Sequence, residues 1–244
     1  MPLIKTFFKS RVVHIGHLNQ SADELKPSRD GFGIAVSESP EAWRAITRAN
    51  APDVVLHNPR AMWLDALSYS GACMDEITAW MRARRYILPV PVWHAQWIDE
   101  ASGDFRDGTW ATREEAAKAA GLTLEQELAA AARGEGVTME GDGYRLTPMA
   151  LKRLGRWHDP LDWFNAAIML HTREVVMLKQ PLVCGVWWDE VEDIPGKVAP
   201  GGVLFPEALR HFEVETEDGD VIPFAEAFPQ FTVLGAAAPE LAWA

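Results

Sequence analysis

The sequence predicts a single α+β domain with a mixed, largely antiparallel sheet and several flanking helices. Three observations support this prediction. Apolar runs rich in Val, Ile and Phe, which are typical of strands, lie toward both ends of the chain. Segments with capping residues and helical spacing lie between and beside these runs. Strand and helix do not alternate strictly, as they would in a doubly wound parallel sheet.

The first predicted elements are strands over 3 to 8, 11 to 15, 32 to 36 and 53 to 56, each an apolar run bounded by polar or Gly/Pro residues. Ser39 followed by Pro40 predicts a helix start, because a hydroxyl can cap the first turn and proline fits its first position. Helical spacing extends that helix to Asn50. A second helix is predicted around Ile77, Trp80 and Met81, running toward Arg85.

The middle of the chain predicts a hairpin followed by helices. Residues 92 to 98 and 105 to 110 form its strands, and 100 to 104 supply turn residues. Capping boxes at Thr112 to Glu115 and Thr123 to Gln126 predict two helix starts. Thr147-Pro148 and Asp159-Pro160 predict two more, and the helix after Asp159 is expected to end at His171, where a cation favours the helix dipole.

The last part of the chain predicts strands again, at 174 to 178, 182 to 188, 211 to 214, 220 to 224 and 231 to 234. Gly201-Gly202 after Pro200 predicts a turn, since the Lys and Ser/Thr of a phosphate-binding loop are missing. The chain has 244 residues, of which 48% are hydrophobic, and no linker of distinct composition divides it. We therefore expect residues 1 to 244 to form one domain.

Charge and composition exclude several classes of function. A net charge of -12, from 35 acidic and 23 basic residues, disfavours nucleic-acid binding but suits a basic protein partner. No apolar stretch is long enough for a membrane span, so we expect a cytoplasmic protein without a membrane association. Cys73 and Cys184 lie far apart without ligand-spaced neighbours, which predicts core residues and no metal site. The oligomeric state is left open.

The tetrapeptide His14-Ile15-Gly16-His17 follows a predicted strand. It resembles the nucleotide-binding signature of class I aminoacyl-tRNA synthetases and their nucleotidyltransferase relatives, in which the histidines open a helix that meets nucleotide phosphates. The chain has no lysine-rich loop of the KMSKS kind. A nucleotidyltransferase is therefore one hypothesis. The alternative is that His14 faces a core or cleft from a strand while Gly16 permits a turn.

Three further stretches occur in a suggestive order. Arg11 to His14 forms an early strand, Gly31 to Trp43 a glycine-led strand that ends in serines before a helix, and Gly185 to Glu192 a late strand that enters an acid-x-acid loop. Together they resemble the ADP-ribosyltransferases. This resemblance implies NAD as the substrate and an ADP-ribosyltransferase or NAD glycohydrolase activity on an unknown target. It also implies that residues 60 to 170 are a helical insertion or lobe.

The resemblance implies roles for polar residues. His14 would bind a ribose hydroxyl or the carboxamide region of NAD, and Ser37 would support the nicotinamide pocket. Glu190 would accept a hydrogen bond from the ribose 2′-hydroxyl and stabilise the positive charge that develops as the glycosidic bond breaks. Glu192 would deprotonate the accepting group. The structural alternative is a capped helix after Ser39 and a loop of solvated acids.

Trp187 and Trp188 are the aromatic residues that the same resemblance places at the cofactor. One of these two rings would stack on NAD. Only one can do so, because adjacent residues on a strand point to opposite faces of the sheet.

A rival hypothesis comes from another class of function. It is a non-catalytic acidic binding protein, such as an inhibitor or immunity factor, whose negative surface and exposed aromatic residues engage a basic protein partner.

Overall fold

The computed structural model describes residues 5–16, 18, 33–47, 52–99, 101–154, 160–191 and 198–229. We expected one domain, and the described chain packs as two compact units. Unit 1 takes its residues from 1–80, 152–158 and 164–244, and unit 2 from 81–151 and 159–163. The sheet of unit 1 is mixed and largely antiparallel, with helices beside it, so the predicted α+β class is confirmed.

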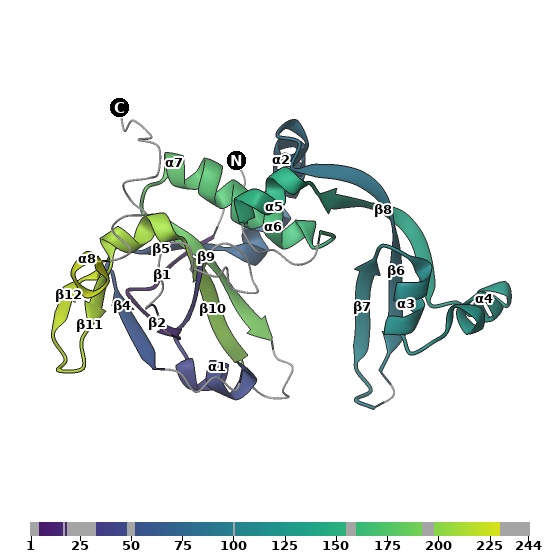
Figure 1. The fold of residues 1–244 in the computed structure, drawn as a ribbon, viewed down its shortest axis with the longest axis horizontal. Helices are drawn as coiled ribbons and strands as arrows, with labels where there is room; N and C mark the ends of the chain where they lie inside the picture. The colour runs from purple at the N-terminus through teal and green to yellow at the C-terminus, as the bar shows by residue number, and fades with distance from the viewer. Residues whose placement is uncertain are drawn as a thin grey trace. The chain divides into compact units, whose positions relative to one another are not determined.

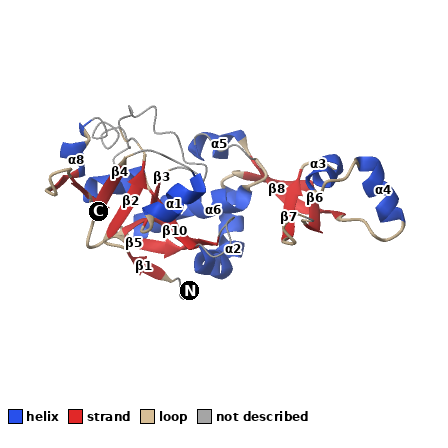
Figure 2. Ribbon diagram, turned by 90° about the horizontal axis from the view of Figure 1, so that it is seen from below, coloured by secondary structure: helices blue, strands red, loops and turns tan. Residues whose placement is uncertain are grey.

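Unit 1 is built on one nine-stranded sheet (Figures 1 and 2). Its strands are β1 (Thr6–Phe8), β2 (Arg11–Ile15), β3 (Ile34–Ser37), β4 (Asp53–His57), β5 (Met62–Asp65), β9 (Val183–Val191), β10 (Val198–Leu204), β11 (Glu213–Glu215) and β12 (Val221–Pro223). Their order across the sheet is β1-β5-β9-β10-β3-β2-β4-β11-β12. Only the β5–β9 pair is parallel among these neighbours.

The helices associated with unit 1 include short and irregular pieces. They are α1 (Pro40–Thr47), α2 (Ala66–Ala83), α6 (Trp163–His171), the π-helix η2 (Thr172–Val176), α7 (Met177–Lys179), the 3-10 helix η3 (Pro206–His211) and α8 (Phe224–Ala227). α5 (Pro148–Leu154) has residues 148–151 in unit 2 and 152–154 in unit 1. The start predicted at Pro40 is confirmed, whereas α2 begins well before the predicted helix around Ile77. The helix start predicted at Asp159 and the strand predicted over 231 to 234 lie outside the described residues.

The strand predicted over 174 to 178 is wrong, because α6 continues through η2 into α7. The β-branched residues of this segment favour a strand locally. However, α6 buries every residue from Ala166 to His171, and this burial fixes the helical path through which the chain continues. Tertiary packing therefore outweighs local propensity. α6 ends at His171, as predicted, but His171 is buried and the chain continues as the π-helix η2.

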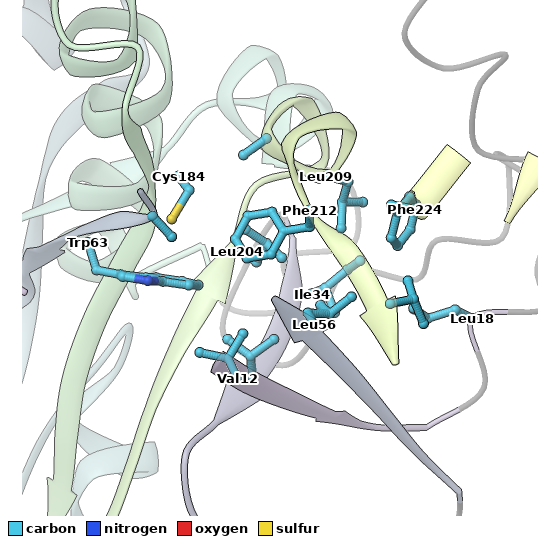
Figure 3. Packing of buried hydrophobic residues seen from close by; sticks show 14 of the residues in the cluster. Val12, Leu18, Ile34, Leu56, Trp63, Cys184, Leu204, Leu209, Phe212 and Phe224 are labelled. Atoms are coloured by element: carbon cyan, nitrogen blue, oxygen red, sulfur yellow. The ribbon is translucent and has the colours of Figure 1, made fainter. Parts of the chain in front are cut away.

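The core of unit 1 packs against one face of the sheet (Figure 3).

Gly201-Gly202, predicted to be a turn, instead lies inside β10. A Cβ atom on Gly202 would lie 2.7 Å from Cε3 of Trp187, and one on Gly201 would lie 2.9 Å from Cζ2 of Trp43. These glycines make room for indole rings on the two faces of the strand, so the turn prediction was wrong.

Unit 2 contains a three-stranded antiparallel sheet of order β7-β6-β8. Its strands are β6 (Ile87–Ile98), β7 (Phe105–Trp110) and β8 (Thr138–Leu146), and its helices are α3 (Arg113–Ala119) and α4 (Leu124–Ala132). The predicted β6–β7 hairpin is confirmed. Residues 60 to 170, which the resemblance implied to be a helical insertion or lobe, therefore contain a sheet as well. β8 was not predicted, because its polar and glycine-rich sequence TMEGDGYRL does not have the apolar pattern of a strand.

Both predicted capping boxes are confirmed. Thr112 and Thr123 each accept a hydrogen bond from the backbone three residues later, and Glu115 and Gln126 each accept one in return. These bonds satisfy backbone donors that a helix start leaves unpaired.

Candidate functional site

His14 lies on β2 with its ring held by the neighbouring strand. Its Nδ1 lies 2.8 Å from the carbonyl oxygen of Ala35. A Cβ atom on Gly16 would lie 2.7 Å from Nε2 of the same ring, so glycine is needed beside it. Burial lowers the pKa of His14 below its ordinary value, although the Ala35 carbonyl and Asp53 oppose this shift. His14 is therefore a neutral, backbone-bonded imidazole at pH 7.

Ser37 is buried at the end of β3, with only 2% of its surface exposed. Its hydroxyl donates to the carbonyl oxygen of Pro200 at 2.7 Å and accepts from the N–H of Ser39 at 2.9 Å. Both interactions tie β3 to its surroundings. The side chain thus uses its hydrogen-bonding capacity on the protein's own backbone.

Strand pairing decides which predicted residues share a face of the sheet. Val13 pairs with Ser37, and both Ser37 and Trp188 pair with Gly201. Directly paired residues point to the same face, and successive residues alternate. Ser37 and Trp188 therefore share one face, whereas His14 points to the other face.

Glu190 follows Trp188 by two residues on β9, so its position in the register belongs to the face of Ser37. Trp187 belongs to the opposite face, with His14. The backbone does not gather the proposed imidazole, hydroxyl and acid on one surface. The side chain of Glu190 and the whole of Glu192 lie outside the described residues.

Trp187 is a core residue. It is 1% exposed and packs edge to face against Trp63, with ring centroids 5.3 Å apart. The Nζ atom of Lys9 lies 5.1 Å from the Trp187 ring centroid. With its faces occupied in this way, the ring is not available for stacking on a ligand. Trp188, on the other face, is half-buried.

The nucleotidyltransferase hypothesis depends on a helix that the two histidines, His14 and His17, open. His17 and residues 19–32 lie outside the described residues, so this hypothesis stays a prediction. The described part places His14 on a strand, bound to Ala35, as the structural alternative expected.

A buried pair in unit 1 gave no signal in the sequence. Tyr69 on α2 and His171 on α6 form a hydrogen bond between the phenol oxygen and Nδ1, and Trp80 packs edge-on against the imidazole at 5.0 Å between centroids. Burial lowers the pKa of His171 and raises that of Tyr69. Both residues are at most 5% exposed, so we assign the pair a role in packing.

The exposed tip of the β6–β7 hairpin in unit 2 has a different character. Ile98 pairs with Phe105, and Gln96 pairs with Asp107, so the four side chains share one face. Ile98 and Phe105 are 67% and 64% exposed. We call these four residues the tip patch. The sequence shows two large apolar residues on either side of an acidic turn, but it does not show that they are exposed.

The opposite face of the same hairpin is packed. Trp93, Trp97 and Trp110 lie on it, with Trp97 and Trp110 centroids 6.0 Å apart. The guanidinium carbon of Arg113 lies 5.0 Å from the Trp93 ring centroid. These aromatic contacts lie on the face opposite to the tip patch, where Ile98 and Phe105 are exposed.

The charge of the tip patch is negative. Arg106, between Phe105 and Asp107, points to the other face and lies 3.6 Å from a carboxylate oxygen of Asp104. Asp107 has no ion-pair partner among the described side chains. The turn that joins the strands is also acidic, and Asp99 accepts hydrogen bonds from the N–H groups of Ala101 and Ser102. Apolar and anionic groups therefore adjoin at the tip.

Among the described residues, His, Cys, Asp and Glu side chains nowhere gather in threes that could hold a metal ion. Cys73 and Cys184 are buried free thiols, as predicted for core residues. None of the helices in the described ranges combines the length and apolar character that a membrane crossing requires.

No protein-family model, curated protein or solved structure matches the chain.

Proposed function

We propose that this protein is a non-catalytic binding protein that takes up an extended, basic segment of a partner protein along β7. This is the acidic inhibitor or immunity-factor hypothesis, with the surface now assigned to the tip patch. The observation that supports it most is the pairing of exposed Ile98 and Phe105 next to the carboxylate of Asp107, which has no ion-pair partner in the described part of the chain.

The position of β7 favours an extended partner. Within the described residues, β7 pairs on one side only, with β6. Its outer edge therefore offers backbone N–H and C=O groups to an added strand, a recurring mode of peptide recognition. Side chains of such a strand alternate, so every second residue would lie on the face of Phe105 and Asp107.

The chemistry of the tip patch favours lysine or arginine in the partner. The long stems of these residues pack on apolar surface while their charged heads reach a carboxylate. Phe105 and Ile98 supply the apolar surface, and Asp107 supplies the charge. The net charge of -12 adds long-range attraction for a basic partner, which raises the association rate.

The test measures fluorescence anisotropy of a labelled peptide of alternating lysine and valine, titrated with the full chain. Phe105→Ser should weaken binding about tenfold or more, because burial of a phenylalanine contributes about 1.5–3 kcal/mol. Asp107→Lys should weaken it as well and flatten its dependence on salt.

Matched controls lie on α4, away from the tip patch in the sequence. Leu128→Ser removes another exposed apolar side chain, and Glu125→Lys reverses another exposed acid. Neither should change the affinity. Binding that is equally weakened by the control variants, or equal binding of a glutamate-valine peptide, would overturn the proposal.

A further inference from the structure

Unit 1 contains a solvent-open cavity whose lining shares no residue with the tip patch. It has a volume of about 300 Å³ and lies between the end of β4, the start of β9 and η3. We propose that it binds a small organic anion, with one carboxylate or phosphate group on a compact apolar body.

The walls of the cavity are fixed by backbone hydrogen bonds. Asn58 donates its N–H to the carbonyl oxygen of Ser10 at 2.9 Å, and its Oδ1 accepts from the N–H of Arg60, also at 2.9 Å. On the opposite side, the N–H of Phe205 donates to the carbonyl oxygen of Cys184 at 3.0 Å, which anchors the start of η3. A cavity held in this way loses little conformational entropy when a ligand binds.

The polar groups that line the cavity are hydrogen-bond donors. The guanidinium of Arg60 has no carboxylate partner among the described side chains. With Oδ1 of Asn58 engaged by the Arg60 backbone, the amide NH₂ group of Asn58 is left to donate. Of the residues that the structure describes, no acidic one lines the cavity, although the chain is strongly acidic. This combination favours an anion.

His211 adds a further donor. Its Nε2 accepts a hydrogen bond from Nε of Arg210 at 3.1 Å, because that arginine N–H can only donate. Burial and the charge of Arg210 lower the pKa of His211. The ring is therefore neutral at pH 7 and carries its proton on Nδ1, from which it can donate to an oxyanion.

The rest of the lining is apolar. Leu182 and Ala208 contribute aliphatic surface, and the Cys184 thiol donates to the carbonyl oxygen of Met62 at 3.2 Å. Burial raises the pKa of the Cys184 thiol, which keeps it protonated and unreactive. The volume is at the low end for ligand pockets, which span about 300–1,000 Å³, so the apolar body must be small.

The experiment is isothermal calorimetry of the full chain with benzoate, phenyl phosphate and benzamide. Benzoate or phenyl phosphate should bind, and whichever binds more tightly identifies the anionic group. Benzamide has the same ring without the charge and should bind at least about tenfold more weakly, since hydrogen bonds to charged groups are stronger than those to neutral groups.

Two variants test the location. Arg60→Gln should weaken anion binding about tenfold or more, whereas Arg145→Gln, which removes another exposed arginine from β8, should leave it unchanged. Leu182→Trp should block the cavity without any change of charge, and Leu182 is 53% exposed, so the fold should tolerate it. Equal binding of benzamide and benzoate, full binding by both Arg60→Gln and Leu182→Trp, or no binding of either anion would overturn the proposal.

Discussion

The buried carboxylate of Glu127 provides a quantitative test of how unit 2 is held together. Glu127 is fully buried on α4 and accepts hydrogen bonds from the N–H groups of Val137 and Thr138, both at 3.1 Å. It also accepts from the Thr138 hydroxyl at 2.6 Å and from Nη2 of Arg113 at 3.2 Å. The network joins α3, α4 and β8.

Glu127→Gln removes the negative charge and turns one acceptor into a donor that faces other donors. Loss of one member of a buried ion pair costs about 3–5 kcal/mol. Arg113 keeps about a quarter of its side chain exposed, at 23%, so water can partly solvate it after the change. We therefore expect unit 2 to lose about 3 kcal/mol of unfolding free energy, at the lower end of this range.

Amide hydrogen exchange of the full chain measures this loss locally. The amides of Val137 and Thr138 should exchange about a hundredfold faster in Glu127→Gln, because 1.4 kcal/mol corresponds to a factor of ten. Glu125→Gln removes an exposed carboxylate from the same helix and should change stability by no more than about 0.5 kcal/mol. Similar exchange in the two variants would refute the role of this network.

The same carboxylate has a pH signature. Burial raises the pKa of Glu127, but hydrogen bonds from Thr138, Val137 and Arg113 outweigh burial and hold it below the ordinary value of 4.5. Its stabilising contribution is therefore complete above pH 4.5 and is lost as the pH falls below that value. Val137 and Thr138 exchange should show this loss, and Glu127→Gln should remove it.

Three further predictions concern unit 1. Gly202→Ala should destabilise the fold by about 1–3 kcal/mol in urea unfolding, because the new methyl group would overlap Trp187. The control Gly71→Ala on α2 places its methyl group in open space and should stabilise the fold by about 0.5–1 kcal/mol. Equal effects of the two substitutions would show that the packing of β10 is misassigned. The lowered pKa values of His14 and His171 make their stabilising contribution complete above pH 6.5 and progressively lost below it. Urea unfolding midpoints of His171→Gln should therefore fall less steeply across this range than those of the wild type, and a parallel fall would contradict the assignment. NAD should give no binding heat and no nicotinamide release, because His14 and Ser37 point to opposite faces; turnover that both His14→Ala and Glu190→Ala abolish would instead restore the ADP-ribosyltransferase hypothesis.

Local signals predicted the elements that depend on local chemistry. The capping boxes at Thr112 and Thr123, the helix start at Pro40 and the β6–β7 hairpin are each determined within a few residues of sequence. The errors arose where distant packing decides the structure. Gly201-Gly202 lies within a strand, where the glycines leave room for Trp43 and Trp187 from other segments of the chain. The segment after His171 is helical because it continues the buried helix α6.

The face of the sheet that each predicted site residue occupies could not be read from the sequence for a similar reason. The order of His14, Ser37 and Glu190 along the chain does not show which face of the sheet each residue occupies. A shift of one residue in register moves a side chain to the other face of a sheet. Exposure of Ile98 and Phe105 was likewise not readable, because the sequence does not reveal that Trp93, Trp97 and Trp110 fill the opposite face.

Amide NMR of the full chain, titrated with the lysine-valine peptide, tests the central proposal most directly. Uptake along β7 predicts chemical-shift changes confined to Gln96, Ile98 and the segment from Phe105 to Asp107, with the changes lost in Asp107→Lys. Changes centred on β2 and β9, or changes that persist unaltered in Asp107→Lys, would contradict it.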